Sequence, residues 1–199
     1  MTPFTIKQFK FKADNSLIMK YLLAGQESTN LLFREIQESD FGDWLEFHKD
    51  PDTSIHWISQ KESPEIECRK WYDYQFQRYK NDKGGMNALI EKKSGKLVGH
   101  CGLLVQTIDE ITELEIGYSL LKKFWNKGYA TEAATKCRNF AFENNFSASL
   151  ISIISLSNKA SEKVALKNGM QVDKQTVYNG NEVNIFRITK NKWLLNNRK

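Results

Sequence analysis

An alternating segment, followed at once by a glycine-containing loop and an alanine-rich stretch, is the feature that most constrains this chain. Residues 112–120 alternate with the period of a β-strand. Its apolar face holds Leu114, Ile116 and Tyr118, and its other face holds Glu113, Glu115 and Gly117. Residues 131–144 are rich in alanine, with apolar residues grouped as on one side of a helix. The sequence therefore predicts a strand, a loop and a long helix in succession.

The loop before this helix has the chemistry of an anion site. Helix N-termini present unpaired N–H groups and about half a unit of positive charge, and a glycine such as Gly128 lets the backbone approach an anion closely. Lys127 and Thr131 would add donors. A single glycine before a helix is also compatible with a plain turn, so the loop alone leaves both interpretations open.

Apolar spacing and turn residues divide the rest of the chain into further elements. Expected strands are 31–36, 87–91, 97–106, 150–154, 171–178 and 182–188, the last two joined by Asn179-Gly180. One helix follows Ser39 or Asp40, and a second begins at Ser63-Pro64 and places Ile66, Lys70, Tyr74 and Arg78 on one stripe. A third is capped by Asn158 and ends at Asn168-Gly169. The pattern predicts one α/β (mixed α+β) domain.

Composition narrows the class of partner. A formal charge of +5 and a pI near 9.0 favour anionic partners, but no run of like charges forms a nucleic-acid-binding tail. His48, His56 and His100 lack metal-ligand spacing, and the three cysteines make neither a disulfide framework nor a CxxC site. The sequence contains no apolar run long enough to predict a signal peptide or a membrane span. We therefore expect a cytoplasmic protein that binds no metal, does not associate with a membrane and does not bind nucleic acid directly.

The loop also resembles a known motif. Residues 125–133, read Trp-Asn-Lys-Gly-Tyr-Ala-Thr-Glu-Ala, are similar to the Arg/Gln-x-x-Gly-x-Gly/Ala motif of the GNAT acetyltransferases, particularly the branch that includes ribosomal-protein N-terminal alanine acetyltransferases. Trp125 stands where most members have Arg or Gln, a departure shared with that branch. The resemblance implies a splayed central mixed sheet flanked by helices, and acetyl-CoA bound through Lys127, Gly128, Tyr129, Ala130 and Thr131.

A second segment, residues 158–170, is similar to the family's Asn-x-x-Ser…Gly-Phe segment, with Met170 in place of the aromatic residue. The resemblance implies that Asn158 reaches the pantetheine arm and that Ser161 protonates the departing thiolate. Many members use a tyrosine later in this helix as the acid, but Ala165 stands there. Without the resemblance, Asn158 reads as a helix cap and Ser161 as a residue of the first turn.

A third segment, residues 113–118, resembles the family's Glu-Ile-Gly-Tyr strand, which lines the acetyl group. By that resemblance Ile116 contacts the cofactor, and the backbone beside Tyr118 polarises the acetyl carbonyl. An amine attacks only when neutral, whereas amine pKa values are about 7.7 to 10.4. Glu115 is therefore the expected base, with Glu113 the second candidate. A solvated glutamate, or one that binds a cationic substrate, is the alternative.

The resemblance covers residues 31–190, which we predict to be the acetyltransferase domain, with 1–30 as an extension and 191–199 as a tail. It implies an N-acetyltransferase that moves acetyl from acetyl-CoA directly to a primary amine, either a protein N-terminus or a small molecule. A non-catalytic acyl-CoA sensor is the alternative. Trp57, Trp71 and Tyr74 are expected in the core or a lid. The sequence does not choose between monomer and homodimer, nor name the acceptor.

Overall fold

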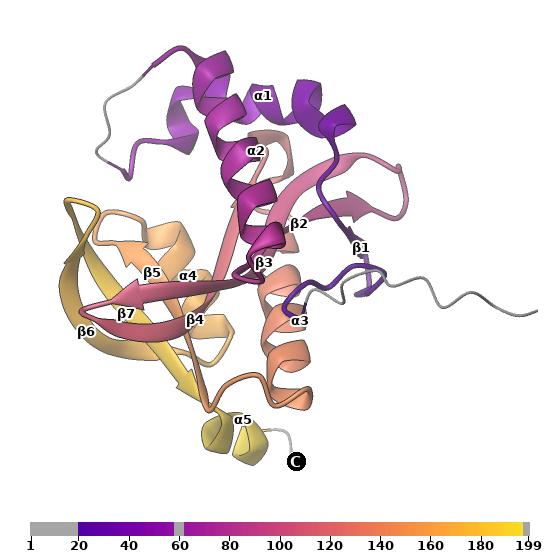
Figure 1. Ribbon diagram of the computed structural model, residues 1–199. Helices are drawn as coiled ribbons and strands as arrows, with labels where there is room; N and C mark the ends of the chain where they lie inside the picture. The colour runs from indigo at the N-terminus through magenta and orange to yellow at the C-terminus, as the bar shows by residue number, and fades with distance from the viewer. Residues whose placement is uncertain (1–19, 58–61, 197–199) are drawn as a thin grey trace, which may run out of the picture.

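A seven-stranded sheet with helices on both faces forms the body of the protein (Figure 1). The computed structural model describes residues 20–57 and 62–196, so most of the predicted extension and the last residues of the predicted tail lie outside the described part. The strand order is β1-β2-β3-β4-β5-β7-β6, and every neighbouring pair is antiparallel except β4 with β5. The predicted mixed α/β sheet flanked by helices is confirmed.

The elements follow the predicted order closely. The strands are β1 Leu31–Arg34, β2 Gly84–Glu91, β3 Leu97–Ile108, β4 Ile111–Leu120, β5 Ser149–Ser155, β6 Gln171–Tyr178 and β7 Asn181–Thr189. The α-helices are α1 Phe41–Lys49, α2 Pro64–Lys80, α3 Tyr129–Glu143, α4 Lys159–Lys167 and α5 Lys190–Asn196. Asn179 and Gly180 both have positive φ, at 49° and 74°, as a two-residue hairpin turn of this hand requires.

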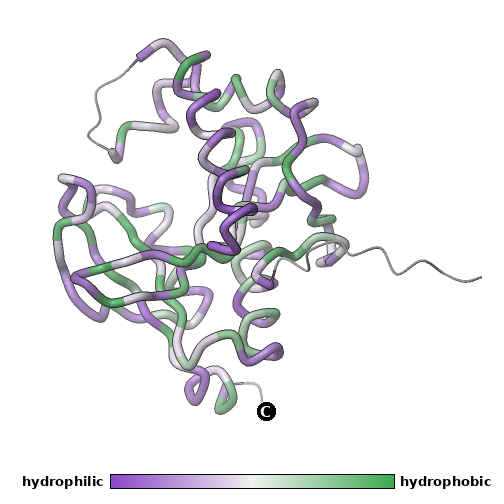
Figure 2. The backbone as a smooth tube through the Cα atoms, in the orientation of Figure 1, coloured by the Kyte–Doolittle hydropathy of each residue, from purple (hydrophilic) through white to green (hydrophobic). Residues whose placement is uncertain are grey.

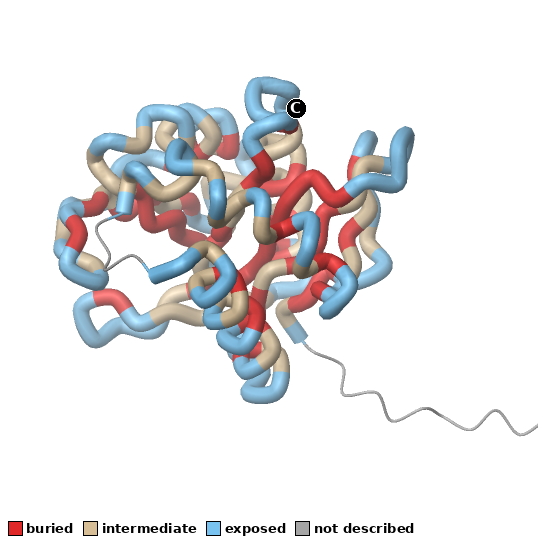
Figure 3. Tube along the Cα trace, turned by 90° about the horizontal axis from the view of Figure 1, so that it is seen from above, coloured by how far each residue is buried: buried red, intermediate tan, exposed pale blue. Residues whose placement is uncertain are grey.

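The two faces of the sheet carry different helices. The rings of Trp44 on α1 and Trp71 on α2 pack against His100 of β3, with centroids 4.2 and 4.7 Å away. The next residue of β3, Cys101, has its sulfur 3.5 Å from that of Cys137 on α3. Because successive strand residues point to opposite faces, α1 and α2 cover one face and α3 the other. The buried residues concentrate in the sheet between these layers (Figure 3).

Helix α2 packs differently from the predicted stripe. Ile66 and Tyr74 are 46% and 52% exposed, and Arg78 is the one buried member of that stripe. The buried residues of this helix are Cys68, Tyr72, Gln75 and Arg78. Figure 2 shows α2 as largely hydrophilic along its length. Of the two places expected for Tyr74, the core and a lid, the structure excludes the core, because its ring is exposed and its hydroxyl accepts a hydrogen bond from Arg78 at 2.9 Å.

Both ends of the described chain are tied to α3. Leu22 and Leu23 are buried, and the Glu132 carboxylate accepts hydrogen bonds from Ser28 and from Asn30. At the other end, the predicted tail forms α5. The indole of Trp193 packs on Phe142 and donates to Asn139 at 3.0 Å. Contacts from both ends thus fix the helix that begins at the predicted anion loop.

Candidate active site

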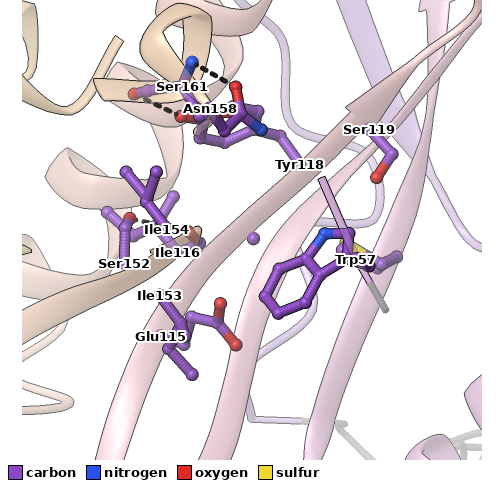
Figure 4. A pocket seen from close by; sticks show the side chains of 12 residues that line it. Trp57, Glu115, Ile116, Tyr118, Ser119, Ser152, Ile153, Ile154, Asn158 and Ser161 are labelled. Carbon is purple, nitrogen blue, oxygen red and sulfur yellow. Dashed lines mark hydrogen bonds between the residues drawn. The ribbon is translucent and has the colours of Figure 1, made fainter. Parts of the chain in front are cut away.

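A pocket of about 170 Å³ lies where β4 and β5 separate (Figure 4). The register of these parallel strands is recorded by one pair, Glu115 with Ile151, among the described residues. One residue further on, the Ser152 hydroxyl donates to the Ile116 carbonyl at 2.9 Å, so a side chain occupies the acceptor that strand pairing would use. The pocket opens beyond this bond, towards the carboxyl ends of both strands, where open α/β sheets usually bind ligands.

The pocket reaches both faces of the sheet. Ser119 is directly opposite His100 in the β3–β4 pair, so it shares the α1/α2 face, and Glu115 lies four residues away on that face. Tyr118 is opposite Cys101 and therefore faces α3. Met86 and Trp57 also line the pocket, as do Asn158 and Ser161 of the α4 N-terminus. Groups on opposite faces of the sheet can therefore meet in one cavity.

Glu115 has the environment of a general base. Its carboxylate accepts a hydrogen bond of 2.7 Å from Gln106 on β3. Burial raises the pKa of Glu115 above its ordinary value, and the Gln106 bond only partly offsets this. A raised carboxyl pKa makes the ionised form a stronger base near neutral pH.

Glu113, the second candidate base, is held elsewhere. Arg187 of β7 donates to both of its carboxylate oxygens, at 2.7 and 3.0 Å. The same guanidinium also bonds Asp173 at 2.9 Å. Of the two glutamates, Glu115 lines the pocket and Glu113 forms an ion pair at the β6–β7 side.

The start of α4 is fixed by three groups that the sequence singled out. The Asn158 side chain accepts a hydrogen bond from the Ser161 N–H at 3.0 Å, which confirms its role as a helix cap. The Tyr118 hydroxyl donates to the Ser161 carbonyl at 3.0 Å. Burial raises the pKa of Tyr118, so its hydroxyl keeps its proton and this bond at neutral pH. The capping bond is compatible with the predicted cofactor contact, because Asn158 and Ser161 also line the pocket.

The predicted anion loop leads into α3 with its backbone exposed. Gly128 has a φ of 85°, and a side chain there would meet nothing within 4 Å, so open space borders the backbone at this point. Trp125 anchors the loop by donating its indole N–H to the Leu120 carbonyl at 2.8 Å. The Lys127 ammonium lies 5.0 Å from the centre of the Phe124 ring.

The first turn of α3 begins with Tyr129, Ala130 and Thr131, all half-buried. The Tyr129 hydroxyl donates to Glu91 of β2, which ties this turn to the sheet. Helix α3 is 15 residues long, so its N-terminal N–H groups carry a full helix-end partial charge. Exposed backbone, an adjacent lysine and a helix N-terminus fit a pyrophosphate.

Sequence reasoning found part of this pocket and missed the rest. It identified Glu115, Ile116, Tyr118, Asn158 and Ser161, and all five line the pocket. The missed lining residues, which carry no local signature, are Met86, Ser119, Ser152, Ile153 and Ile154. Strand pairing and helix packing bring them to the site. Among the residues that the structure describes, no group of three His, Cys, Asp or Glu side chains is placed to hold a metal, and no helix is long and apolar enough to cross a membrane.

Comparison with known proteins identifies the family. Residues 30–171 match the acetyltransferase (GNAT) domain. The chain therefore belongs to the GNAT acetyltransferases and is an acetyltransferase, as the loop motif predicted. The relatives include the uncharacterized protein YkkB of Bacillus subtilis, 34% identical over 63% of this chain and 72% of that protein. The uncharacterized N-acetyltransferase YoaA of the same organism is 26% identical over 82% of this chain and 96% of its own.

Solved structures share the fold. An acetyltransferase from Agrobacterium tumefaciens superposes with a TM-score of 0.69 at 21% identity, over 82% of this chain and 92% of that one. RimL, a ribosomal L7/L12 alpha-N-protein acetyltransferase in complex with coenzyme A, superposes with a TM-score of 0.65 at 18% identity, over 83% of this chain and 97% of RimL. A spermidine N-acetyltransferase from Vibrio cholerae, in complex with CoA and spermine, superposes with a TM-score of 0.65 at 13% identity, over 83% of this chain and 98% of that one.

Proposed function

We propose that this protein transfers acetyl from acetyl-CoA directly to a primary amine, in a complex that holds both substrates. The observation that carries the proposal is the pocket between β4 and β5, which opens to both faces of the sheet and places Glu115 on one face and Ser161 on the other. A donor held on the α3/α4 face and an acceptor held on the α1/α2 face would meet in this opening.

The donor would bind along the loop before α3. The backbone of Gly128, Tyr129 and Ala130, with the Lys127 ammonium and the Thr131 hydroxyl, offers donors to a pyrophosphate. From there to the pocket, the exposed groups of Asn158 and the edge of β4 at Ile116 would contact the pantetheine arm. Lys123, which lies just before the loop, suits the phosphates of coenzyme A.

Glu115 would prepare the acceptor. Amines are largely protonated at neutral pH, since their pKa values run from about 7.7 for an α-amine to about 10.4 for a lysine. Glu115 takes the proton, directly or through water, and leaves the nitrogen lone pair free to attack. Its raised pKa favours this transfer.

The transfer then forms one bond and breaks another. The amine nitrogen bonds to the acetyl carbonyl carbon while the carbon–sulfur bond breaks, and the backbone N–H beside Tyr118 stabilises charge on the carbonyl oxygen. The Ser161 hydroxyl gives its proton to the departing sulfur. The nitrogen loses one proton as the amide forms, and that proton returns through water to the Ser161 oxygen. The products are an acetylated amine and coenzyme A with a free thiol.

Similar proteins leave the acceptor class open, since one is named for a ribosomal protein N-terminus and another for spermidine. We propose a primary amine of one of these kinds, a protein N-terminus or a small molecule. The three described cysteines are free thiols, which suits a reducing compartment such as the cytoplasm.

Release of the coenzyme A thiol tests the proposal. Purified protein and acetyl-CoA are combined with N-terminal peptides, lysine peptides, polyamines, amino sugars and amino acids in turn. Stimulation by one class supports the proposed reaction and names its acceptor. Tight acetyl-CoA binding with no stimulation by any amine would overturn catalysis and favour an acyl-CoA sensor.

A further inference from the structure

The two sides of the pocket carry opposite charge, although the whole chain is basic. Residues 35–82, which include α1 and α2, contain 12 Asp and Glu against six Lys and Arg. Residues 120–170, which include the anion loop, α3 and α4, contain eight Lys and Arg against three Asp and Glu. The segment that covers the acceptor side is therefore acidic, whereas the segment on the donor side is basic. An acidic approach to a cavity concentrates cations there.

A second pocket, of about 230 Å³, adjoins the first on this acidic side. Its lining residues are Phe47, His48, Lys49, Pro51, Thr53, Ser54, Glu62, Pro64 and Glu67. The two pockets share a wall, because the Trp57 N–H donates to the Ser54 carbonyl at 3.1 Å and these residues line the first and second pocket respectively. The two pockets therefore lie on either side of a single turn of the chain.

The second pocket has unused hydrogen-bonding and charge capacity. Glu67 forms no ion pair with a described cation, and its carboxylate accepts one bond, from the Glu62 N–H at 3.3 Å. The Nε2 atom of His48 is buried without a partner in the described part of the chain. Burial lowers the pKa of His48, so the ring is neutral near pH 7 and does not repel a cation. Lys49, the one basic lining residue, is 3.5 Å from Glu46. Glu62 is paired with Lys70 of α2, so Glu67 is the lining carboxylate that no described cation pairs.

The shared wall is fastened to the donor side of the molecule. His56 bonds the Ser157 hydroxyl at 2.9 Å, immediately before the α4 cap. Lys122, at the end of β4, pairs with Asp50 and Asp52. These contacts hold Trp57, 37% exposed, at the mouth of the pocket that contains Glu115 (Figure 4). An indole and a carboxylate in one cavity are a favourable pair for an ammonium group.

We infer that the acceptor is a small molecule with at least two ammonium groups, whose reacting nitrogen sits between Trp57 and Glu115 and whose second nitrogen binds beside Glu67. The inference rests on the proposed acetyl transfer, and it names the acceptor class. The second ammonium keeps its proton throughout, so the acidic pocket holds the substrate while Glu115 deprotonates only the reacting end.

The test compares linear diamines of increasing length with monoamines of the same length, measured by release of the coenzyme A thiol. We expect kcat/KM for the best diamine to exceed that of its monoamine by about tenfold, which corresponds to about 1.4 kcal/mol, with an optimum chain length. Glu67→Gln should remove most of this advantage by raising KM for the diamine, and should leave monoamine kinetics unchanged.

Glu65→Gln is the matched control, because Glu65 lies in the same first turn of α2 but does not line the pocket. Thermal unfolding of both variants checks that they fold alike. Equal rates for diamines and monoamines, or equal effects of the two variants, would overturn the inference. Acetylation of N-terminal peptides but not of diamines would also overturn it, while the proposed acetyl transfer would stand. Binding of the best diamine to Glu115→Gln, followed by calorimetry, gives a readout that needs no turnover.

Discussion

The proposed donor side and the proposed acceptor side of the pocket are built from different kinds of groups. On the proposed donor side, the exposed backbone at Gly128 and the N-terminus of α3 would offer the binding atoms. On the acceptor side, the side chains of Trp57, Glu115 and Glu67 line the two pockets. The donor side is basic and the acceptor side acidic.

This difference explains why the sequence predicted residues for the proposed donor side more readily than for the proposed acceptor side. Backbone recognition requires glycine and small residues at fixed spacing, so it leaves a motif in one short segment. Side-chain recognition draws on residues that the fold collects from distant segments, and any residue of suitable chemistry can serve. A family can thus keep its donor while its acceptors vary.

The largest expected effect comes from a charge placed in the donor loop. Gly128→Glu should weaken acetyl-CoA binding about a thousandfold, because a carboxylate about 4 Å from a phosphate costs about 4 kcal/mol. Isothermal titration measures the Kd. Gly180→Glu is the control, since Gly180 also has positive φ and open space but lies in the β6–β7 turn. If both variants bound normally, the pyrophosphate would not lie at this loop.

A change on the acceptor side should spare the donor. Glu115→Gln is expected to lower kcat/KM at least about a hundredfold by removing the base, with the Kd for acetyl-CoA unchanged. In the wild type, the rate should fall with acid as the raised pKa of Glu115 is crossed, at higher pH than for an ordinary carboxyl. Steady-state kinetics across pH measure both. An acid limb that persists unchanged in the variant would assign it to another group.

The neighbouring glutamate should behave in the opposite way. Glu113→Gln breaks a half-buried ion pair with Arg187 and should cost about 2 kcal/mol of unfolding free energy, with little change in turnover. Urea unfolding and the thiol assay give the two quantities. A large loss of turnover without a loss of stability would make Glu113 the base instead.

A smaller kinetic effect is expected from the leaving-group side. Ser161→Ala removes a hydroxyl from the pocket but keeps the backbone groups that bond Asn158 and Tyr118. We expect kcat to fall about tenfold, at the low end for proton-transfer groups because water can substitute. Single-turnover kinetics measure this step. An unchanged kcat would show that the thiolate gains its proton elsewhere.

The smallest expected effect concerns stability. Because burial raises the folded-state pKa of Glu115 above its unfolded value, stability present at low pH is lost as pH rises through the folded pKa. Glu115→Gln should therefore raise the Tm at neutral pH and lose this advantage in acid. Calorimetric scans of the wild type and the variant, at neutral and at acid pH, measure the difference in Tm. A lower Tm for the variant at neutral pH would contradict the account of a buried, strained base.

The sequence was sufficient where structure depends on local chemistry. Ser63-Pro64 marked the start of α2, and Asn179-Gly180 marked a hairpin. It failed where distant contacts decide: α5 depends on Trp193 packing against Phe142, and no local pattern shows that contact.

The site divides in the same way. The motif residues Ile116, Tyr118, Asn158 and Ser161 could be assigned to one site beforehand. The sequence ranked Glu115 ahead of Glu113 only through the family resemblance. The contacts that distinguish the two carboxylates come from Gln106 on β3 and Arg187 on β7. Alternation along one strand puts both glutamates on one face and gives no reason to prefer either.

Amine-dependent release of the coenzyme A thiol, measured side by side for the wild type and Glu115→Gln with acetyl-CoA saturating, tests the central claim most directly. We expect turnover in the wild type, a loss of at least about a hundredfold in the variant, and equal affinity of both proteins for acetyl-CoA. Equal turnover by the two proteins would contradict the role of Glu115 and of the pocket built around it.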